Sequence, residues 1–294
     1  MPKPPAWAIR AALALALAPP LAAGAGGAAA QQVPELASTD RLRVCADPAN
    51  MPFSDKAGEG FENKIAAIVA DELKRPLRFF WVPQGPGAVR NSLGSGLCDV
   101  IIGYASGADI VQHSNPYYRS AYVLVVKAGG PLDGVDRLED PRLQGHRLGV
   151  IAATPPADHL LRLGLTAEAK TYALLVDRRS DSPAEEALAD LAAGTVDGVI
   201  LWGPIGGYFS KKAAVPLKVT PLVKETERPA LSFRITFGIR AGEIQWKHKL
   251  NDVIRKRRAD IEAVLTSYGV PLVPDDGRLD ESERDRPVRV DEGQ

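Results

Sequence analysis

The stretch RVCADPANMPFSDKAGEGFENKIAAIVADEL, residues 43–73, determines the fold class. It reads as a short strand, a loop rich in turn-forming residues, and a helix that begins near Gly60 with apolar residues at helical spacing. A strand, loop and helix in this order is the repeating unit of an open α/β sheet. Ligands of such sheets bind at the carboxyl ends of the strands, where Asp47, Asn50 and Phe53 lie. The sequence therefore predicts an α/β fold with a binding or active site beside this loop.

The same unit recurs along the chain. Strands are predicted at 41–46, 77–83, 98–104, 118–129, 145–154, 171–176, 196–202, 217–223 and 233–242. Helices are predicted at 61–73, 87–97, 156–164, 183–194 and 243–267. CDVIIGY (98–104) and VDGVILW (196–202) each follow a short helix that ends in Gly, which indicates two lobes built alike. We expect lobe one at 40–127 plus 225–273 and lobe two at 128–224, with a ligand cleft between them.

The two ends of the chain differ from its middle. MPKPPAWAIR followed by AALALALAPPLAAGAGGAAA is typical of a signal peptide at 1–30. The alternative is a membrane anchor, but Pro19 and Pro20 interrupt the apolar run before the ~20 residues that a span requires. Residues 274–294 carry many charges and few apolar groups, and we expect a disordered tail. The sequence thus predicts an exported, periplasmic protein without a membrane span in the mature chain.

Charge excludes one class of partner. The chain has 36 basic and 36 acidic residues, and removal of residues 1–30 takes away Lys3 and Arg10 and no acid. The remaining 34 basic and 36 acidic residues give a net charge of −2. Nucleic-acid-binding proteins usually carry a clear basic excess, so we expect no nucleic acid as a partner.

Cys45 and Cys98 are the two cysteines of the chain. In an exported protein such a pair can form a disulfide. The alternative is a pair of small buried apolar side chains, and the sequence leaves the choice open because a bridge has strict geometry. Neither a Cys-x-x-Cys spacing nor a nearby His accompanies the pair, so we expect no metal site.

Catalytic motifs are absent from the sequence. It contains no G-x-S-x-G, H-E-x-x-H, G-x-x-x-x-G-K-[ST] or G-x-G-x-x-G pattern. Asp47 and Glu62 could form a carboxylate pair for acid–base work, but a loop-shaping Asp47 and a Glu62 at the helix start account for them better. We therefore expect no catalytic residue and no cofactor, and an exported hydrolase is the least favoured class. The histidines are scattered along the chain: His113, His146, His159 and His248.

SNPYYRSAYVLVV (114–126), together with the lobe pattern and the signal peptide, resembles the type II periplasmic solute-binding proteins of ABC transporters. The resemblance covers roughly residues 40–270 and implies two lobes, each a mixed, mostly parallel sheet flanked by helices, joined by a two-segment hinge. The amino-acid-binding branch has an Arg that clamps the substrate carboxylate; here that place falls in ASGADI (105–110), without Arg. That branch also has an Asp for the amino group where this chain has Leu201, Trp202 and Gly203. We therefore do not expect ordinary amino-acid transport.

A narrower resemblance rests on RVCADPANMPFSDKAGEGFENKIA (43–66), VRNSLGSGLCDVIIG (89–103) and NPYYRSAYV (115–123). Together they resemble the binding-protein-like family associated with PQQ-dependent methanol dehydrogenases, the MxaJ/XoxJ type. The resemblance implies a non-enzymatic periplasmic accessory protein that binds and helps mature or activate the dehydrogenase, with the partner cytochrome c as a further contact. The alternative is the substrate-binding protein of an ABC-type transporter for a small polar or aromatic solute.

The resemblance also implies which residues line the cleft. Arg90 could instead pair with an acid of its own lobe, and Trp202 could serve packing alone. Thr154 precedes a helix start that would favour an anion, although Pro155 and Pro156 remove two donors there. The cleft could hold a small molecule, a segment of a protein or nothing. The implied cleft residues are Asp47, Asn50, Phe53, Gly60, Phe61, Arg90, Tyr104 and Ser106 of lobe one, and Thr154, Pro155 and Trp202 of lobe two.

Overall fold

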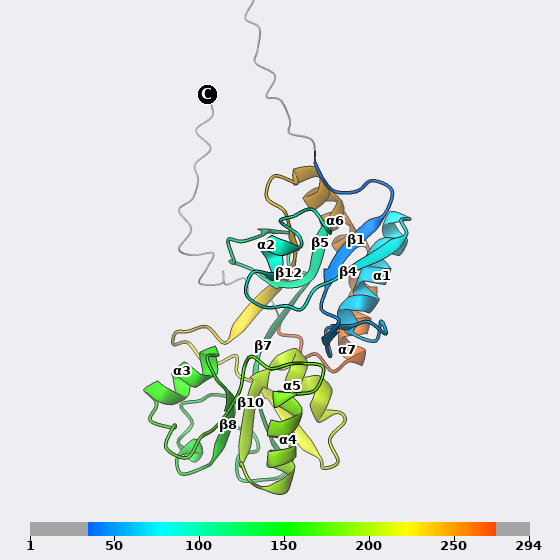
Figure 1. Cartoon of the computed structure of the whole chain (residues 1–294). Coiled ribbons are helices and arrows are strands. Elements are labelled where there is room, and N and C mark those ends of the chain that lie inside the picture. Colours follow the sequence, from blue (N-terminus) through cyan, green and yellow to red (C-terminus); the bar gives the residue numbers. More distant parts are fainter. Residues whose placement is uncertain (1–34, 275–294) are drawn as a thin grey trace, which may run out of the picture. The chain divides into compact units, whose positions relative to one another are not determined.

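The computed structural model describes residues 35–274 (Figure 1). The predicted signal peptide, and the predicted tail beyond Pro274, lie outside the described residues. The described part is an α/β structure in which a 10-stranded sheet has the strand order β4-β1-β5-β12-β7-β10-β8-β9, with β11 beside β7 and β6 beside β12. No helix within residues 35–274 is both long and apolar enough to cross a membrane. The predicted α/β, two-lobe fold class is confirmed.

One half of the sheet surrounds β1, which pairs in parallel with β4 and β5. Its strands are β1 (Leu42–Ala46), β4 (Leu77–Trp81), β5 (Val100–Ala105) and β12 (Ser232–Ile239), with the short β2 (Ala49–Asn50), β3 (Ser54–Asp55) and β6 (Gln112–His113). Its helices are α1 (Phe61–Leu73), α2 (Ala88–Asn91), α6 (Ile244–Lys256) and α7 (Arg258–Ser267). Phe61, Phe237 and Trp246, from three distant segments, share one buried core in this half.

The other half surrounds β10, which is parallel to β8 and antiparallel to β7. Its strands are β8 (Leu148–Ile151), β9 (Lys170–Tyr172), β10 (Gly198–Trp202) and β11 (Leu217–Pro221). Its helices are α3 (Pro155–Arg162), α4 (Pro183–Ala193), α5 (Gly203–Ser210) and the short 3-10 helix η1 (Pro141–Leu143). Two separate cores, one around Leu148 and one around Leu191, are packed in this half.

Strand β7 (Tyr118–Lys127) belongs to both halves (Figure 1). Its first residues, Tyr118–Ala121, pair with β12, and from Tyr122 onward it pairs with β10. The change of partner therefore lies inside β7, upstream of residue 127, where the sequence places the end of the first lobe segment. A second crossing lies beside it, because the Tyr122 amide donates to the Leu231 carbonyl at 2.7 Å, just before β12 begins. The lobe boundaries themselves remain predictions.

Several predicted elements are wrong in extent. The single helix predicted at 243–267 is two helices, α6 and α7, separated at Arg257, whose φ of −105° and ψ of 19° leave the helical range. The helix predicted at 87–97 ends at Asn91, because the φ of −127° and ψ of −81° of Ser92 leave the helical range. Helix α5 was not predicted, since GPIGGYFS contains the residues least typical of helices.

The two cysteines form a disulfide in the structure, with Cα atoms 5.5 Å apart. The bridge joins β1 to the residue pair that precedes β5. Cys45 and Cys98 are buried in a small core with Val89 and Leu93 beneath α2. Of the two alternatives that the sequence leaves open, the structure therefore has the disulfide and not a pair of unbonded buried thiols.

Candidate functional site

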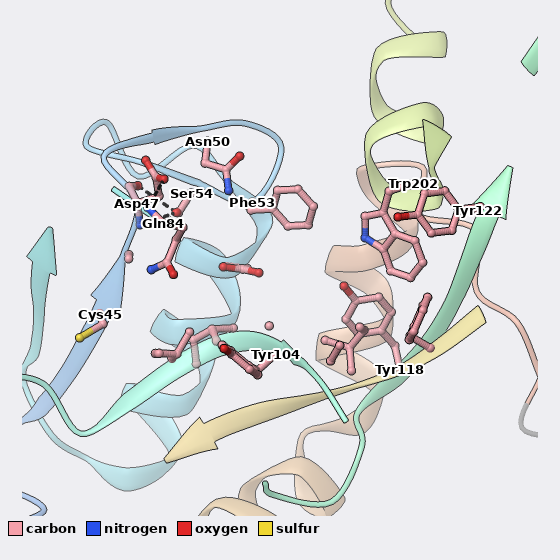
Figure 2. Close-up of a pocket in the computed structure, with 18 of the residues that line it drawn as sticks. Cys45, Asp47, Asn50, Phe53, Ser54, Gln84, Tyr104, Tyr118, Tyr122 and Trp202 are labelled. Carbon is pink, nitrogen blue, oxygen red and sulfur yellow. Dashed lines mark hydrogen bonds between the residues drawn. The ribbon is translucent and has the colours of Figure 1, made fainter. Parts of the chain in front are cut away.

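A cavity of about 490 Å³ lies where the carboxyl ends of β1, β5 and β10 approach β7 and β12 (Figure 2). We call it the central cavity. Its volume falls in the range of small-molecule sites. Small and apolar residues of β1 and β5 form part of its wall. The other residues that line it are Asp47, Asn50, Phe53, Ser54, Glu62, Gln84, Tyr104, Tyr118, Tyr122, Pro155, Trp202, Phe233 and Ile235.

The loop before α1 forms one wall, and side-chain hydrogen bonds fix its shape. The Ser54 hydroxyl bonds the amide and the carbonyl of Asp47, at 3.1 and 2.9 Å. The Asn63 side-chain oxygen accepts from the amides of Asp55 and Gly60 at 3.0 and 3.1 Å. A Cβ at Gly60 would lie 2.1 Å from the Phe53 carbonyl oxygen, so this close approach requires glycine. The loop is thus tied to the first turn of α1.

Asp47 is one of two acidic side chains in the cavity wall, and its charge is compensated. The residue is only 4% exposed. Its carboxylate accepts from the backbone amides of Ala49 and Gln84 at 2.9 and 2.8 Å. Arg178, from the connection between β9 and α4, donates to it at 3.2 Å. This ion pair links the two halves of the sheet across the cavity edge.

Glu62, at the start of α1, is the second acidic side chain, and its surroundings differ. Within residues 35–274 its carboxylate has neither a hydrogen-bond donor nor a basic partner. The carboxylate packs against the backbone of Gly103, whose φ is +83° and where a Cβ would lie 1.9 Å from Glu62 Oε1. Burial, and secondarily the charge of Asp47, raise the pKa of this carboxyl well above its usual value.

Aromatic side chains supply most of the apolar wall. The ring centroids of Tyr122 and Trp202 are 5.3 Å apart, and those of Trp202 and Phe233 are 5.8 Å apart. Figure 2 shows Trp202, Tyr122 and Tyr118 on one side of the cavity and Phe53 facing them from the other. Burial raises the pKa of Tyr122 to about 12, so its ring is neutral at physiological pH.

The central cavity offers an anion polar donors but no positive charge. Among residues 35–274, no Lys, Arg or His side chain lines it. The first amides of α1 are occupied, because Phe61 N and Glu62 N donate to the carbonyls of Pro52 and Phe53, each at 2.8 Å. Helix α3 begins with Pro155 and a second proline, which have no N–H to offer. Among residues 35–274 there is also no cluster of side chains suited to a metal ion.

The structure brings some of the predicted site residues together and separates others. Phe61 is buried behind Phe53, with ring centroids 5.2 Å apart, and Gly60 supports the loop rather than the cavity surface. Arg90 is exposed on α2, and neither it nor Ser106 is part of the cavity lining. Thr154 lines a neighbouring cavity of about 770 Å³ instead. The predicted residues that line the central cavity are Asp47, Asn50, Phe53, Tyr104, Pro155 and Trp202.

Other lining residues escape sequence reasoning. For Glu62 the sequence favours a role at the helix start over a carboxylate pair with Asp47, and neither interpretation places it in a binding cleft, although it faces the cavity. Tyr118 and Tyr122 were not singled out; their even spacing on one strand is the signal that places both on one face. Gln84 and Phe233 carry no local sequence signal, since only the tertiary fold brings them here.

Two α/β halves joined by a shared strand, with an aromatic cavity at the strand ends between them, define a two-lobe binding protein. Residues 42–269 match the bacterial extracellular solute-binding proteins, family 3. The chain belongs to that family, and within it to the periplasmic binding proteins of MxaJ/XoxJ type. Members of this family bind rather than transform their ligands, which agrees with the prediction that the protein is not an enzyme.

Three relatives show how far this similarity extends. "Protein MoxJ" of Paracoccus denitrificans is 31% identical over 269 residues, which are 85% of this chain and 96% of that protein. The crystal structure of the periplasmic binding protein XoxJ from Methylobacterium extorquens AM1 shares 49% identity, with a TM-score of 0.68, over 79% of this chain and 99% of that one. MxaJ from Methlophaga aminisulfidivorans MPT shares 26% identity and the same TM-score of 0.68, over 79% of this chain and 100% of that one. The family predicted from the sequence is confirmed.

Proposed function

We propose that the protein is a non-enzymatic periplasmic accessory protein that binds a PQQ-dependent methanol dehydrogenase and helps to mature or activate it. The full-length similarity to MoxJ and XoxJ carries this proposal, because the MxaJ/XoxJ resemblance implies such a partner. The family assignment to extracellular binding proteins supports the proposed export to the periplasm.

The chemistry of the central cavity supports a role other than amino-acid uptake. An amino acid carries a carboxylate, and this cavity offers neither a basic side chain nor an open helix start to hold it. Residues 105–110, where the amino-acid-binding branch keeps its clamping Arg, contain none. A protein of this family without those anchors has lost the usual reason to recognise an amino acid.

Purification from the periplasm tests the proposal. A chain with a carboxyl-terminal affinity tag should retain the dehydrogenase, and its cytochrome c, when periplasmic extract is passed over the resin. A strain that lacks the gene should hold dehydrogenase polypeptide of reduced specific activity, restored by the gene in trans. Normal dehydrogenase activity in that strain, with no retained dehydrogenase in the extract, would contradict the proposal.

A second candidate function is that of a solute receptor for an ABC-type transporter. The observation that favours it is the central cavity itself, whose volume of about 490 Å³ and aromatic wall suit a small molecule. A ligand at a hundredfold excess over its dissociation constant stabilises the folded state by about 2.7 kcal/mol. A thermal-shift screen of small polar and aromatic solutes on the purified chain should then give at least one clear rise in Tm. If no solute raises the Tm, the receptor function is contradicted and the accessory function is the remaining candidate.

A further inference from the structure

The central cavity has an unbalanced distribution of charge. Asp47 is satisfied by two backbone amides and by Arg178, which lies at the cavity edge and not in its lining. Glu62 has no such partner within residues 35–274. A carboxylate in a largely apolar wall is unfavourable unless a cation or a hydrogen bond compensates it. The described part of the chain therefore supplies no cation to Glu62.

The wall around this carboxylate is suited to a cation from outside. Six aromatic side chains surround the same space: Tyr104, Tyr118, Tyr122, Trp202, Phe53 and Phe233. Aromatic faces attract positively charged groups, most strongly for Trp, and alkyl groups pack well against them. Neutral tyrosines add hydroxyl groups that can accept hydrogen bonds. An anion would face the opposite situation, because none of the described lining residues is basic and the starts of α1 and α3 offer it no free amide.

We propose that the central cavity binds a small organic cation of the alkylammonium class, with the ammonium group at Glu62 and the apolar part against the rings of Trp202 and Tyr122. The proposal concerns the ligand of the cavity and holds for either of the functions considered above. It excludes polycarboxylates such as PQQ and disfavours zwitterionic amino acids.

Binding at this site is coupled to a proton. Burial and Asp47 keep the carboxyl of Glu62 protonated to a higher pH than usual, and the arriving ammonium favours its ionised form. The proton leaves Glu62 for the solvent as the ion pair forms. The other titratable groups that interact with Glu62 are Tyr117, which directly precedes β7, and Tyr118, the first residue of β7. Burial, as the largest cause, raises the pKa of both, so they stay neutral. Affinity for the cation should therefore rise as the pH rises through the pKa of Glu62.

Three probes of one shape and different charge test the proposal. Titration calorimetry on the purified chain compares 2-phenylethylammonium, 2-phenylethanol and phenylacetate at one pH and ionic strength. We expect 2-phenylethylammonium to bind at least about tenfold more tightly than the neutral alcohol, and phenylacetate to show no binding. The same titration in buffers of different ionisation enthalpy should report the released proton.

Two matched variants locate the charge. Glu62→Gln keeps the shape of the side chain and should lower the affinity for 2-phenylethylammonium by about tenfold or more and abolish the proton release. Glu59→Gln removes the same charge from an exposed side chain three residues away and should leave both unchanged. Equal binding of all three probes, tighter binding of phenylacetate, unchanged affinity in Glu62→Gln, or no binding of 2-phenylethylammonium at millimolar concentration would each overturn the proposal. None of these results depends on a dehydrogenase partner.

Discussion

Glu62 and Gly103 act as a pair at the scale of single residues. The glycine leaves the space into which the carboxylate packs, since any Cβ there would overlap Glu62 Oε1. The carboxylate in turn lies next to backbone rather than next to a donor side chain. This contact explains why a residue at the exposed-looking start of a helix can have a strongly shifted pKa.

The pH dependence of stability reports this shift. Folding raises the pKa of Glu62 above its ordinary 4.5, so the folded state holds the proton more tightly than the unfolded chain. The resulting stabilisation is fully present below pH 4.5 and is lost as the pH rises through the folded pKa. In Glu62→Gln this loss should be absent. As the pH rises through the folded pKa, the free energy of unfolding of the variant should therefore increase relative to that of the wild type, by about 1.4 kcal/mol per unit of pKa shift. Urea unfolding of both chains at several pH values measures the difference, and parallel profiles would contradict it.

A substitution at Gly103 separates backbone strain from the contact with Glu62. Gly103→Ala places a side chain at φ +83° and against Glu62, whereas Gly134→Ala places one at φ +79° with nothing within 4 Å. Both should lose about 1 kcal/mol of stability because alanine disfavours left-handed backbone. Gly103→Ala should lose more than Gly134→Ala, since the carboxylate at the end of the Glu62 side chain has to move. Equal losses in urea unfolding would show that Glu62 does not occupy this space.

The disulfide joins two neighbouring elements, β1 and the start of β5. It closes a loop with a sequence separation of 53 residues. The chain-entropy relation assigns about 4 kcal/mol of stabilisation to a loop of this length. The variant Cys45→Ala/Cys98→Ala should lose about this much free energy of unfolding. Dithiothreitol should lower the free energy of unfolding of the wild type to about that of the variant and leave that of the variant unchanged. An equal change in both proteins would contradict the presence of the disulfide.

Elements with strong local signals could be predicted, and elements fixed by distant contacts could not. The helix at 61–73 has the predicted bounds because its apolar spacing and the preceding Gly60 act locally. Helix α5 contains three glycines and a proline, and two of those glycines are needed for close contacts: a Cβ at Gly207 would lie 1.9 Å from the Gly269 carbonyl, and one at Gly203 would lie 2.4 Å from the Ala121 carbonyl. Such contacts leave no trace in the local sequence.

The candidate site follows the same rule. Asp47, Asn50 and Phe53 could be predicted because they follow a recognisable strand. Tyr122 reaches the cavity because β7 pairs with β10 and places it opposite Trp202 in the ladder. That register joins strands about eighty residues apart in sequence and is set by the whole fold. Glu62 could be picked out from the sequence. Its lack of a basic partner within residues 35–274 could not, because it depends on which side chains the other elements place around it.

At the scale of the whole molecule, the ion pair between Asp47 and Arg178 is a polar contact between the two halves at the cavity edge. Its 3.2 Å distance joins the end of β1 to the connection after β9. Arg178 is 36% exposed, so the pair should contribute no more than about 1 kcal/mol and should weaken in salt. A contact of this strength is suited to a joint that opens and closes.

The neighbouring arginine supplies the control for this contact. Arg178→Ala should increase the radius of gyration measured by small-angle scattering at low ionic strength, because the halves lose one of the contacts between them. Arg179→Ala should leave it unchanged, since Arg179 pairs with Asp177 of its own loop at 2.6 Å. High salt should bring the wild type toward Arg178→Ala. Identical scattering from both variants would show that the pair does not hold the halves.

The shared strand β7 and the late position of β12 also set the order in which the molecule can be finished. The half that contains β1 receives Phe237, Trp246 and Leu265 of its core only from β12, α6 and α7, which come last among the elements of residues 35–274. When the ribosome has synthesised the chain up to β11, the core around β1 is still incomplete. A nascent chain of this design cannot complete the core around β1 before β12, α6 and α7 have been synthesised.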